Sequence, residues 1–413
     1  MYDLIIVGGG ISGLYLYYKL IHSGKKIILL EKNKNLGGRI YQHEENVSGH
    51  RYSFPAGAAR FNEKHKLVIQ LLRDFDLIDF RKHKPLSSKL SFIDTKGNFS
   101  EKFKNKTGFD YIRAVLKHAK QHDIKLLKQT SFQKFAATCL PKDEVDFLLV
   151  ASGYSGQLKK MNMYDAYFLF KDGINDTDNY YVGRFHILIE KLEQFLKKNN
   201  GMIRKNSDVK TLQYDCNKQL YVLGCNGKKM HTRTIALCIP QQALLSFPFL
   251  KPIKHILSTS IDTKPLCRVY ACFKKEDIWF HNLQKKIITN NPLRFIIPMD
   301  NENGLIMISY SDDVYCNYWN KIKHSEKQLK DAIVKHVNQT FRIHIQPPEK
   351  VWVFYWEHGV GYWKPNIDSE QMSKFIRHPF SNVYICGENY SLQQSWVEGA
   401  LESCEKTLES LQL

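Results

Sequence analysis

Hydrophobic and polar positions at the start of the chain predict a strand, a helix and a second strand in close succession. Residues 2–7 form a short apolar run with β-branched side chains, which is typical of a buried parallel strand. After a cluster of glycines, apolar residues recur at helical spacing from Leu14 to Ile21, and Gly24 ends that helix. Residues 25–30 follow as a second strand. Together these elements predict a βαβ unit, the beginning of an α/β fold.

The rest of the chain mixes helical and strand-like segments, with no internal repeat and no low-complexity linker. Helical periodicity predicts helices over 67–75, 109–118, 185–198 and 396–411, and apolar runs predict strands over 202–212, 219–224, 232–239 and 383–386. Residues 96–106 are rich in Lys and prone to turns, and 252–380 is strand-rich and irregular. This order favours domains that interleave along the chain over domains that follow one another.

Composition and charge exclude several classes of protein. The chain has 413 residues, 43% of them hydrophobic, which is enough for a large core in two or three domains. A mean hydropathy of −0.39 excludes a polytopic membrane protein. The net charge of +19 allows contact with nucleic acid or another polyanion, although Lys scattered beside abundant Asn and Ile is better explained as a compositional bias.

The cysteine pattern and the two ends of the chain predict the cellular compartment of the protein. Nine Cys without a C-x-x-C pair favour reduced thiols, with neither a disulfide framework nor a metal site. The first strand begins almost at Met1, so no signal peptide precedes it, and no long apolar tail closes the chain. We therefore expect a soluble, cytoplasmic protein without a membrane span. The oligomeric state is left open.

A glycine triplet lies between the first predicted strand and its helix. It has the spacing Gly8-x-Gly10-x-x-Gly13. The first glycine allows a tight turn, the second lets a pyrophosphate approach the backbone, and the third brings the helix against the strand. Glu31 ends the second strand, where a carboxylate holds the ribose hydroxyls of an adenosine. The unit predicts a dinucleotide-binding domain.

Further motifs at both ends of the chain identify the dinucleotide by resemblance. Near the N-terminus these are Leu36-Gly37-Gly38-Arg39, Gly57-Ala58-Ala59-Arg60-Phe61 and Glu63-Lys64-His65-Lys66. Near the C-terminus they are Gly387-Glu388 and Trp396-Val397-Glu398-Gly399-Ala400. Together they resemble the flavin-dependent amine oxidase family, most closely its L-amino-acid oxidase branch.

The resemblance implies that the cofactor is FAD. Gly361 stands where monoamine oxidases carry their flavin-linking Cys, so FAD is expected to bind without a covalent bond. Val209 matches a residue that holds adenine through its backbone, although a core valine is an equal alternative. The expected cofactor-binding residues are Gly8, Gly10, Ile11, Ser12, Gly13, Glu31, Lys32, Gly38, Arg39, Gly57, Ala58, Ala59, Arg60, Val209, Gly387, Glu388, Trp396, Val397 and Ala400.

Four residues are expected at the reacting end of the site. Arg60 matches the arginine that binds the substrate carboxylate in L-amino-acid oxidases; the alternatives are a structural ion pair or a contact to the flavin. Arg268 stands where the family usually keeps a Lys that is bonded through water to flavin N5, which puts the reaction of reduced flavin with oxygen in question. Tyr362 and Trp396 are expected to flank the amine as an aromatic cage, with core packing as the alternative.

The predicted fold is α/β: a Rossmann-type, glutathione-reductase-like FAD-binding domain (1–80, 184–250 and 376–413) and an interleaved mixed α+β substrate domain (81–183 and 251–375). The resemblance implies an oxidoreductase that converts an amine or L-amino acid to an imine, with oxygen as acceptor and hydrogen peroxide as product. Two alternatives stay open. One is another flavin desaturase or isomerase on the same scaffold. The other is a catalytically degraded FAD-binding protein with a structural or polyanion-binding role.

Overall fold

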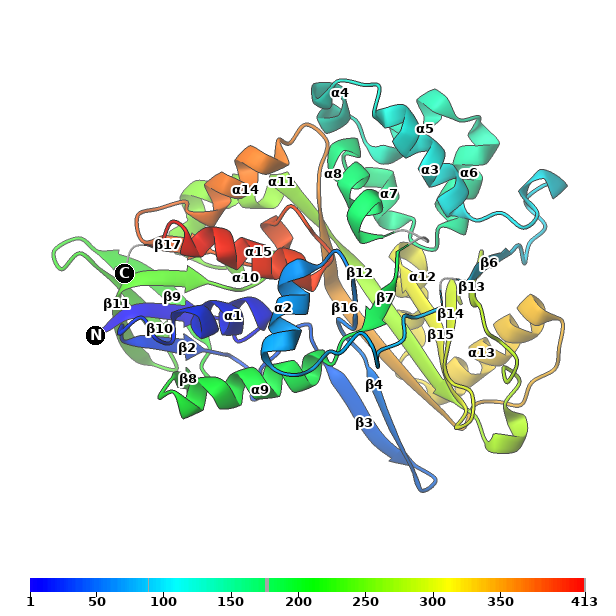
Figure 1. Cartoon of the computed structure of the whole chain (residues 1–413), viewed down its shortest axis with the longest axis horizontal. Coiled ribbons are helices and arrows are strands. Elements are labelled where there is room, and N and C mark those ends of the chain that lie inside the picture. Colours follow the sequence, from blue (N-terminus) through cyan, green and yellow to red (C-terminus); the bar gives the residue numbers. More distant parts are fainter. Residues whose placement is uncertain (88, 175–177, 412–413) are drawn as a thin grey trace.

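A computed structural model describes residues 1–87, 89–174 and 178–411, and its larger sheet has seven strands (Figure 1). The strand order is β8-β2-β1-β11-β10-β9, and β17 also pairs with β11. Five of these strands, β8, β2, β1, β11 and β17, are parallel, and the other two, β10 and β9, continue from β11 as an antiparallel meander. The strands are β1 (Tyr2–Val7), β2 (Ile27–Leu30), β8 (Met202–Arg204), β9 (Val209–Asp215), β10 (Leu220–Cys225), β11 (Lys228–Leu237) and β17 (Val383–Ile385).

Both faces of this sheet are covered around its central strands, which explains the apolar runs of β1, β2 and β17. Leu4 and Ile6 of β1 pack into a core with four helices on one face, α1 (Ile11–Leu20), α2 (Lys66–Asp74), α9 (Phe185–Lys198) and α15 (Val397–Leu408). Ile5 and Val7 alternate to the other face. That face is covered by the β9–β10 meander and by α10 (Gln241–Leu245), η3 (Pro248–Ile253), α11 (Lys254–Ser260) and α14 (Ser369–Arg377).

A second, six-stranded sheet has the order β16-β12-β15-β14-β13-β6. Its strands are β6 (Leu90–Ile93), β12 (Ile261–Cys272), β13 (Lys286–Thr289), β14 (Phe295–Asp300), β15 (Leu305–Asp312) and β16 (Lys350–Trp363). Helices α12 (Asp313–Ile322) and α13 (Glu326–Phe341) bury one face. The hairpin of β3 (Gln42–Val47) and β4 (His50–Pro55) packs on this sheet through Phe54, whose ring stacks on Tyr270 at 4.1 Å.

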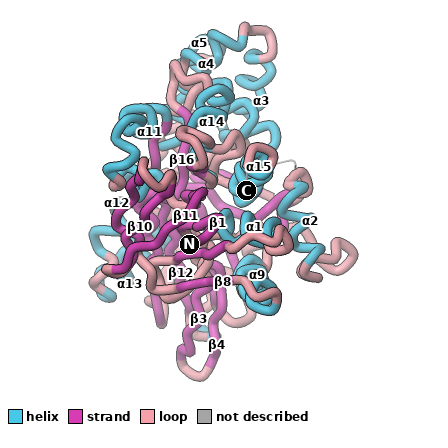
Figure 2. Tube along the Cα trace, turned by 90° about the vertical axis from the view of Figure 1, so that its left-hand side faces the viewer, coloured by secondary structure: helices cyan, strands magenta, loops and turns pink. Residues whose placement is uncertain are grey.

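A group of short helices forms one end of the molecule, opposite the β3–β4 hairpin (Figure 2). It comprises α3 (Gly108–Ala119), α4 (Ile124–Gln129), α5 (Phe132–Cys139), α6 (Lys142–Ala151), α7 (Gly156–Lys160) and α8 (Met163–Phe168). A π-helical turn η2 (Leu169–Gly173) leads back to β7 (Tyr180–Val182), which pairs with β5 (Arg60–Asn62). The remaining short turns are η1 (Glu101–Phe103), η4 (Lys275–Asp277) and η5 (Glu388–Tyr390).

The α/β fold class is confirmed, and the helix expected over 185–198 coincides with α9. The strand expected over 202–212 is wrong as one element: it divides into β8 and β9 around Asn206, whose φ of 51° breaks the extended backbone. In 81–183 only the first of six α-helices was expected, and 252–380 contains helices beside its strands. The domain boundaries stay a prediction.

The described part of the chain has no helix that combines the length and apolar character needed to span a bilayer.

Candidate functional site

One large cavity connects the seven-stranded sheet, the six-stranded sheet and the helical group. Its volume is about 1120 Å³, at the upper limit of small-molecule pockets, which leaves room for a dinucleotide and a second molecule. Its wall includes most of the residues expected to bind the cofactor, namely Gly8, Gly10, Ile11, Ser12, Glu31, Lys32, Gly38, Arg39, Gly57, Ala58, Ala59, Arg60, Val209, Gly387, Glu388, Trp396, Val397 and Ala400.

The glycine turn between β1 and α1 forms one end of this wall. A Cβ added at Gly10 meets no atom within 4 Å, so the backbone there is open to the cavity. A Cβ at Gly13 lies 2.0 Å from the carbonyl oxygen of Gly8, so Gly13 serves close packing behind the cavity wall. Gly10 caps α1 without a side-chain hydrogen bond, and the first turn of α1 has no acidic residue. The free N–H groups of this helix end are a site for an anion.

Glu31 lies beside the glycine turn and is buried. Its Oε2 accepts a hydrogen bond from the N–H of Gly9 (2.7 Å), and its Oε1 accepts one from the N–H of Asn33 (2.8 Å). These two bonds hold the carboxylate at the cavity edge, and each oxygen keeps a further lone pair for a hydroxyl donor. Val209, buried at the start of β9, lines the same region.

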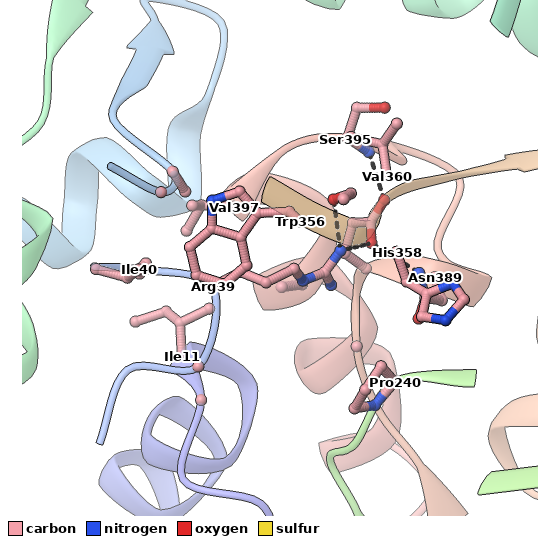
Figure 3. A pocket seen from close by; sticks show the side chains of 18 of the residues that line it. Ile11, Arg39, Ile40, Pro240, Trp356, His358, Val360, Asn389, Ser395 and Val397 are labelled. Atoms are coloured by element: carbon pink, nitrogen blue, oxygen red, sulfur yellow. Dashed lines mark hydrogen bonds and ion pairs between the residues drawn. The ribbon is translucent and has the colours of Figure 1, made fainter. Parts of the chain in front are cut away.

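A charged network joins the N-terminal and C-terminal motifs (Figure 3). The Nη1 of Arg39 donates to Oε2 of Glu388 (2.8 Å) and to the carbonyl of Gly359 (3.0 Å). The Oε1 of Glu388 accepts hydrogen bonds from the N–H of Ser395 (2.7 Å) and, more weakly, from that of Gly361 (3.3 Å). Glu388 is 5% exposed, and its buried charge is compensated by these donors. The network fixes three distant segments around one wall.

The loop after β4 packs tightly against the turn that carries Arg39. A Cβ at Gly57 lies 2.0 Å from the carbonyl oxygen of Arg39, and the N–H of Ala58 donates to that same oxygen (2.9 Å). Trp356, on the cavity wall, donates through Nε1 to the carbonyl of Ala56 (2.8 Å). Only glycine fits at position 57, so this close approach explains the glycine found there.

Trp396 is the N-cap residue of α15, which begins at the cavity without a side-chain cap. Its indole Nε1 is buried and has no hydrogen-bond partner among the described residues. The ring of His65 lies 4.7 Å from the Trp396 ring, edge to face. Burial lowers the pKa of His65 to about 4, so the imidazole is neutral near pH 7. Trp396 therefore borders the cavity with its ring, while its indole N–H is enclosed by protein.

Cationic and aromatic side chains meet at the end of the cavity formed by the six-stranded sheet. The guanidinium carbons of Arg268 and Arg60 lie 4.8 and 5.9 Å from the centre of the Tyr310 ring. The Nη1 of Arg268 donates to the carbonyl of Pro55 (3.0 Å). Lys286 also lines this end. Sequence reasoning missed Lys286 and Tyr310 because no motif surrounds either residue.

The structure does not bring Tyr362 to the cavity, which corrects the expected aromatic cage. Its side chain is fully buried in the core of the helical group. Its hydroxyl donates to Oδ2 of Asp262 (2.8 Å), its direct partner across the β12–β16 pair. Burial, together with this carboxylate, raises the pKa of Tyr362 well above its ordinary value. Trp396 alone of the expected pair faces the cavity.

Comparisons with known proteins agree with this architecture. Residues 11–407 match the family described as flavin containing amine oxidoreductase. An L-amino acid oxidase of Cerastes cerastes is 22% identical, over 97% of this chain and 85% of that protein. An (S)-6-hydroxynicotine oxidase of Paenarthrobacter nicotinovorans is 48% identical over 76 residues, 18% of this chain and 17% of that protein. A solved putrescine oxidase, bound to putrescine, superposes with a TM-score of 0.77 at 14% identity, covering 99% of this chain and 98% of that one.

Proposed function

Because the chain belongs to the flavin-containing amine oxidoreductase family, we propose that it uses FAD to oxidise the C–N bond of an amine or L-amino acid. The observation that carries the proposal is a single cavity. That cavity joins a dinucleotide-type glycine turn at one end to Arg60 and Trp396 at the other. A cofactor at the first end and a substrate at the second then meet without a further conformational change.

The residues on the cavity wall fit FAD. Open space above Gly10 and the uncapped start of α1 suit a pyrophosphate, and the carboxylate of Glu31 suits a ribose. The uncapped start of α15 lies on the same wall, beside Val397 and Ala400. It suits the edge of the flavin on which negative charge accumulates. Gly361 offers no sulfur for a covalent link, so we propose non-covalent binding.

The chemistry needs few protein groups. FAD held by these residues would supply a hydride acceptor for the carbon beside a neutral amine, and water would hydrolyse the imine product to a keto acid or aldehyde and ammonia. Arg60 binds the substrate carboxylate through two parallel hydrogen bonds and so fixes the α-carbon. Trp396, whose ring borders the cavity, excludes water from the amine.

We further propose that oxygen takes the electrons and is released as hydrogen peroxide. Arg268, at the position where the family usually has Lys, is 8% exposed and lines the cavity. A guanidinium there supplies a fixed positive charge, and it holds a water molecule through those N–H groups that do not bond to Pro55.

The test begins with purified protein. A yellow protein that releases FAD on heat or acid denaturation is expected; protein that does not take up FAD, or flavin that stays on the denatured chain, contradicts the cofactor proposal. A panel of amines and amino acids is then mixed with the protein without oxygen, and bleaching of the flavin absorption is followed. Air is admitted afterwards, and reoxidation with formation of peroxide tests the acceptor. No bleaching by any amine overturns the proposed reaction.

A further inference from the structure

We propose that the substrate is an amino acid with an acidic side chain, whose second negative charge is bound by Lys286 while Arg60 binds the α-carboxylate. The inference rests on the proposed function and narrows its substrate class. Three cationic side chains, on β5, β12 and β13, surround the same end of the cavity.

The three cations lie close together. Arg268 and Arg60 both contact the ring of Tyr310, with guanidinium carbons 4.8 and 5.9 Å from its centre. Lys286 is near enough to Arg60 for the two charges to interact: burial, and then the charge of Arg60, lowers the pKa of Lys286 to about 8. The ammonium is therefore still mostly protonated near pH 7.

No carboxylate of the described residues forms an ion pair with any of these three side chains. The three aspartates on the cavity wall interact elsewhere, and one of them, Asp208, forms an ion pair with Lys210 (2.5 Å). Asp178 forms an ion pair with Lys64 (2.8 Å). Asp312 accepts a hydrogen bond from the N–H of Gly156 (2.8 Å) and faces the charge of Arg294. The cluster thus keeps an excess of positive charge inside a protein cavity.

Of the three cations, Arg268 is buried and the other two are partly exposed to the cavity. Positive charge that faces a partly enclosed cavity without a carboxylate partner is unfavourable, and a ligand with complementary charge relieves it. A neutral amino acid supplies one carboxylate, which one guanidinium satisfies in a bidentate pair. The two other cations then remain unpaired. A second acidic group on the side chain compensates them, whereas a diamine such as putrescine brings further positive charge into a positive cavity.

The first experiment compares side chains of equal shape. Anaerobic flavin reduction is measured with L-glutamate against L-glutamine and with L-aspartate against L-asparagine, and putrescine is added as a cationic substrate. The concentration that gives half-maximal flavin reduction is expected to be about thirtyfold lower, or more, for the acid than for the matching amide. O-Phospho-L-serine distinguishes a phosphate from a carboxylate as the preferred acidic group. Equal values for acid and amide, or reduction by putrescine in preference to both, overturn the inference and leave the proposed function intact.

The second experiment changes the cluster. Lys286→Met keeps the unbranched stem of the side chain and removes the ammonium group with its charge. It is expected to raise the half-saturating concentration of L-glutamate by about tenfold or more, and that of L-glutamine much less. The control is Lys285→Met, because Lys285 is the exposed neighbour and does not line the cavity. An equal loss for both substrates means that Lys286 supports the fold, which contradicts its role in recognition.

A binding measurement separates this inference from the proposed reaction. Glutarate carries two carboxylates and no amine. Valerate, the matched control, carries one carboxylate and no amine. The thermal stability of the holoprotein is expected to rise with glutarate, less with valerate, and not with glutarate in Lys286→Met. If no amine bleaches the flavin and glutarate still stabilises the protein, the reaction is wrong and the acidic site is right. Equal stabilisation by glutarate and valerate refutes the acidic site.

Discussion

Two alanine substitutions in the glycine turn separate a cofactor cradle from a packing contact. At Gly10 an added methyl group meets no protein atom within 4 Å, and φ is −73°, which any residue adopts. At Gly13 the same methyl group lies 2.0 Å from the carbonyl oxygen of Gly8. Gly10→Ala therefore perturbs only a ligand that approaches the turn, whereas Gly13→Ala perturbs the fold itself.

The magnitudes follow from these contacts. Gly10→Ala is expected to change the free energy of unfolding of the apoprotein by less than about 1 kcal/mol, since only the cap preference changes. Gly13→Ala is expected to cost about 1–3 kcal/mol or more, because the obstacle is backbone and does not rotate away. For FAD, a methyl group in the path of the pyrophosphate is expected to weaken binding at least about tenfold, or about 1.4 kcal/mol.

The assay is urea unfolding of each apoprotein with and without a fixed concentration of FAD. At a concentration 100 times the wild-type dissociation constant, FAD stabilises the wild type by about 2.7 kcal/mol; a tenfold weaker variant gains about 1.4 kcal/mol. Full stabilisation of Gly10→Ala by FAD refutes a pyrophosphate above Gly10. A loss of apoprotein stability in Gly10→Ala equal to that in Gly13→Ala refutes the open cradle.

Three further predictions concern buried groups around the cavity. Because the pKa of His65 is lowered to about 4, its neutral form contributes to stability above pH 6.5, and up to about 3 kcal/mol of this is lost as the pH falls towards 4. His65→Gln should reduce the difference in unfolding free energy between pH 7 and pH 5. An unchanged difference contradicts this prediction. Tyr362→Phe should leave anaerobic flavin reduction unchanged and cost about 1 kcal/mol of stability through the lost hydrogen bond to Asp262. Slower flavin reduction in this variant would indicate that Tyr362 does contact the substrate. Glu388→Gln should lower FAD affinity. The amide of Gln turns its own N–H towards either Arg39 or the N–H of Ser395, both of which now donate to the carboxylate, and so disturbs the wall that they hold. Unaltered flavin retention on gel filtration refutes this.

The end of the cavity that holds the glycine turn was predictable because its parts are local. A strand, a glycine turn and a helix lie within about twenty residues, and their backbone geometry follows from residue types that are adjacent in the chain. Helix α9 was predicted for the same reason, since apolar residues at helical spacing mark its buried face. The short helices α4 to α8 have only five to ten residues each, too few for a clear period, and tertiary packing stabilises them.

The substrate end depended on the tertiary structure. Arg60, on β5, lies far along the chain from Arg268, on β12, and no local pattern indicates that both contact Tyr310. Tyr362 was expected at the site, and the tertiary structure places it elsewhere. Its motif placed it beside the flavin, but the register of β12 against β16, shifted between Lys264 and Leu266, pairs it with Asp262 inside the core. Spacing along a chain determines backbone turns, whereas the register between strands determines which side chains share a cavity.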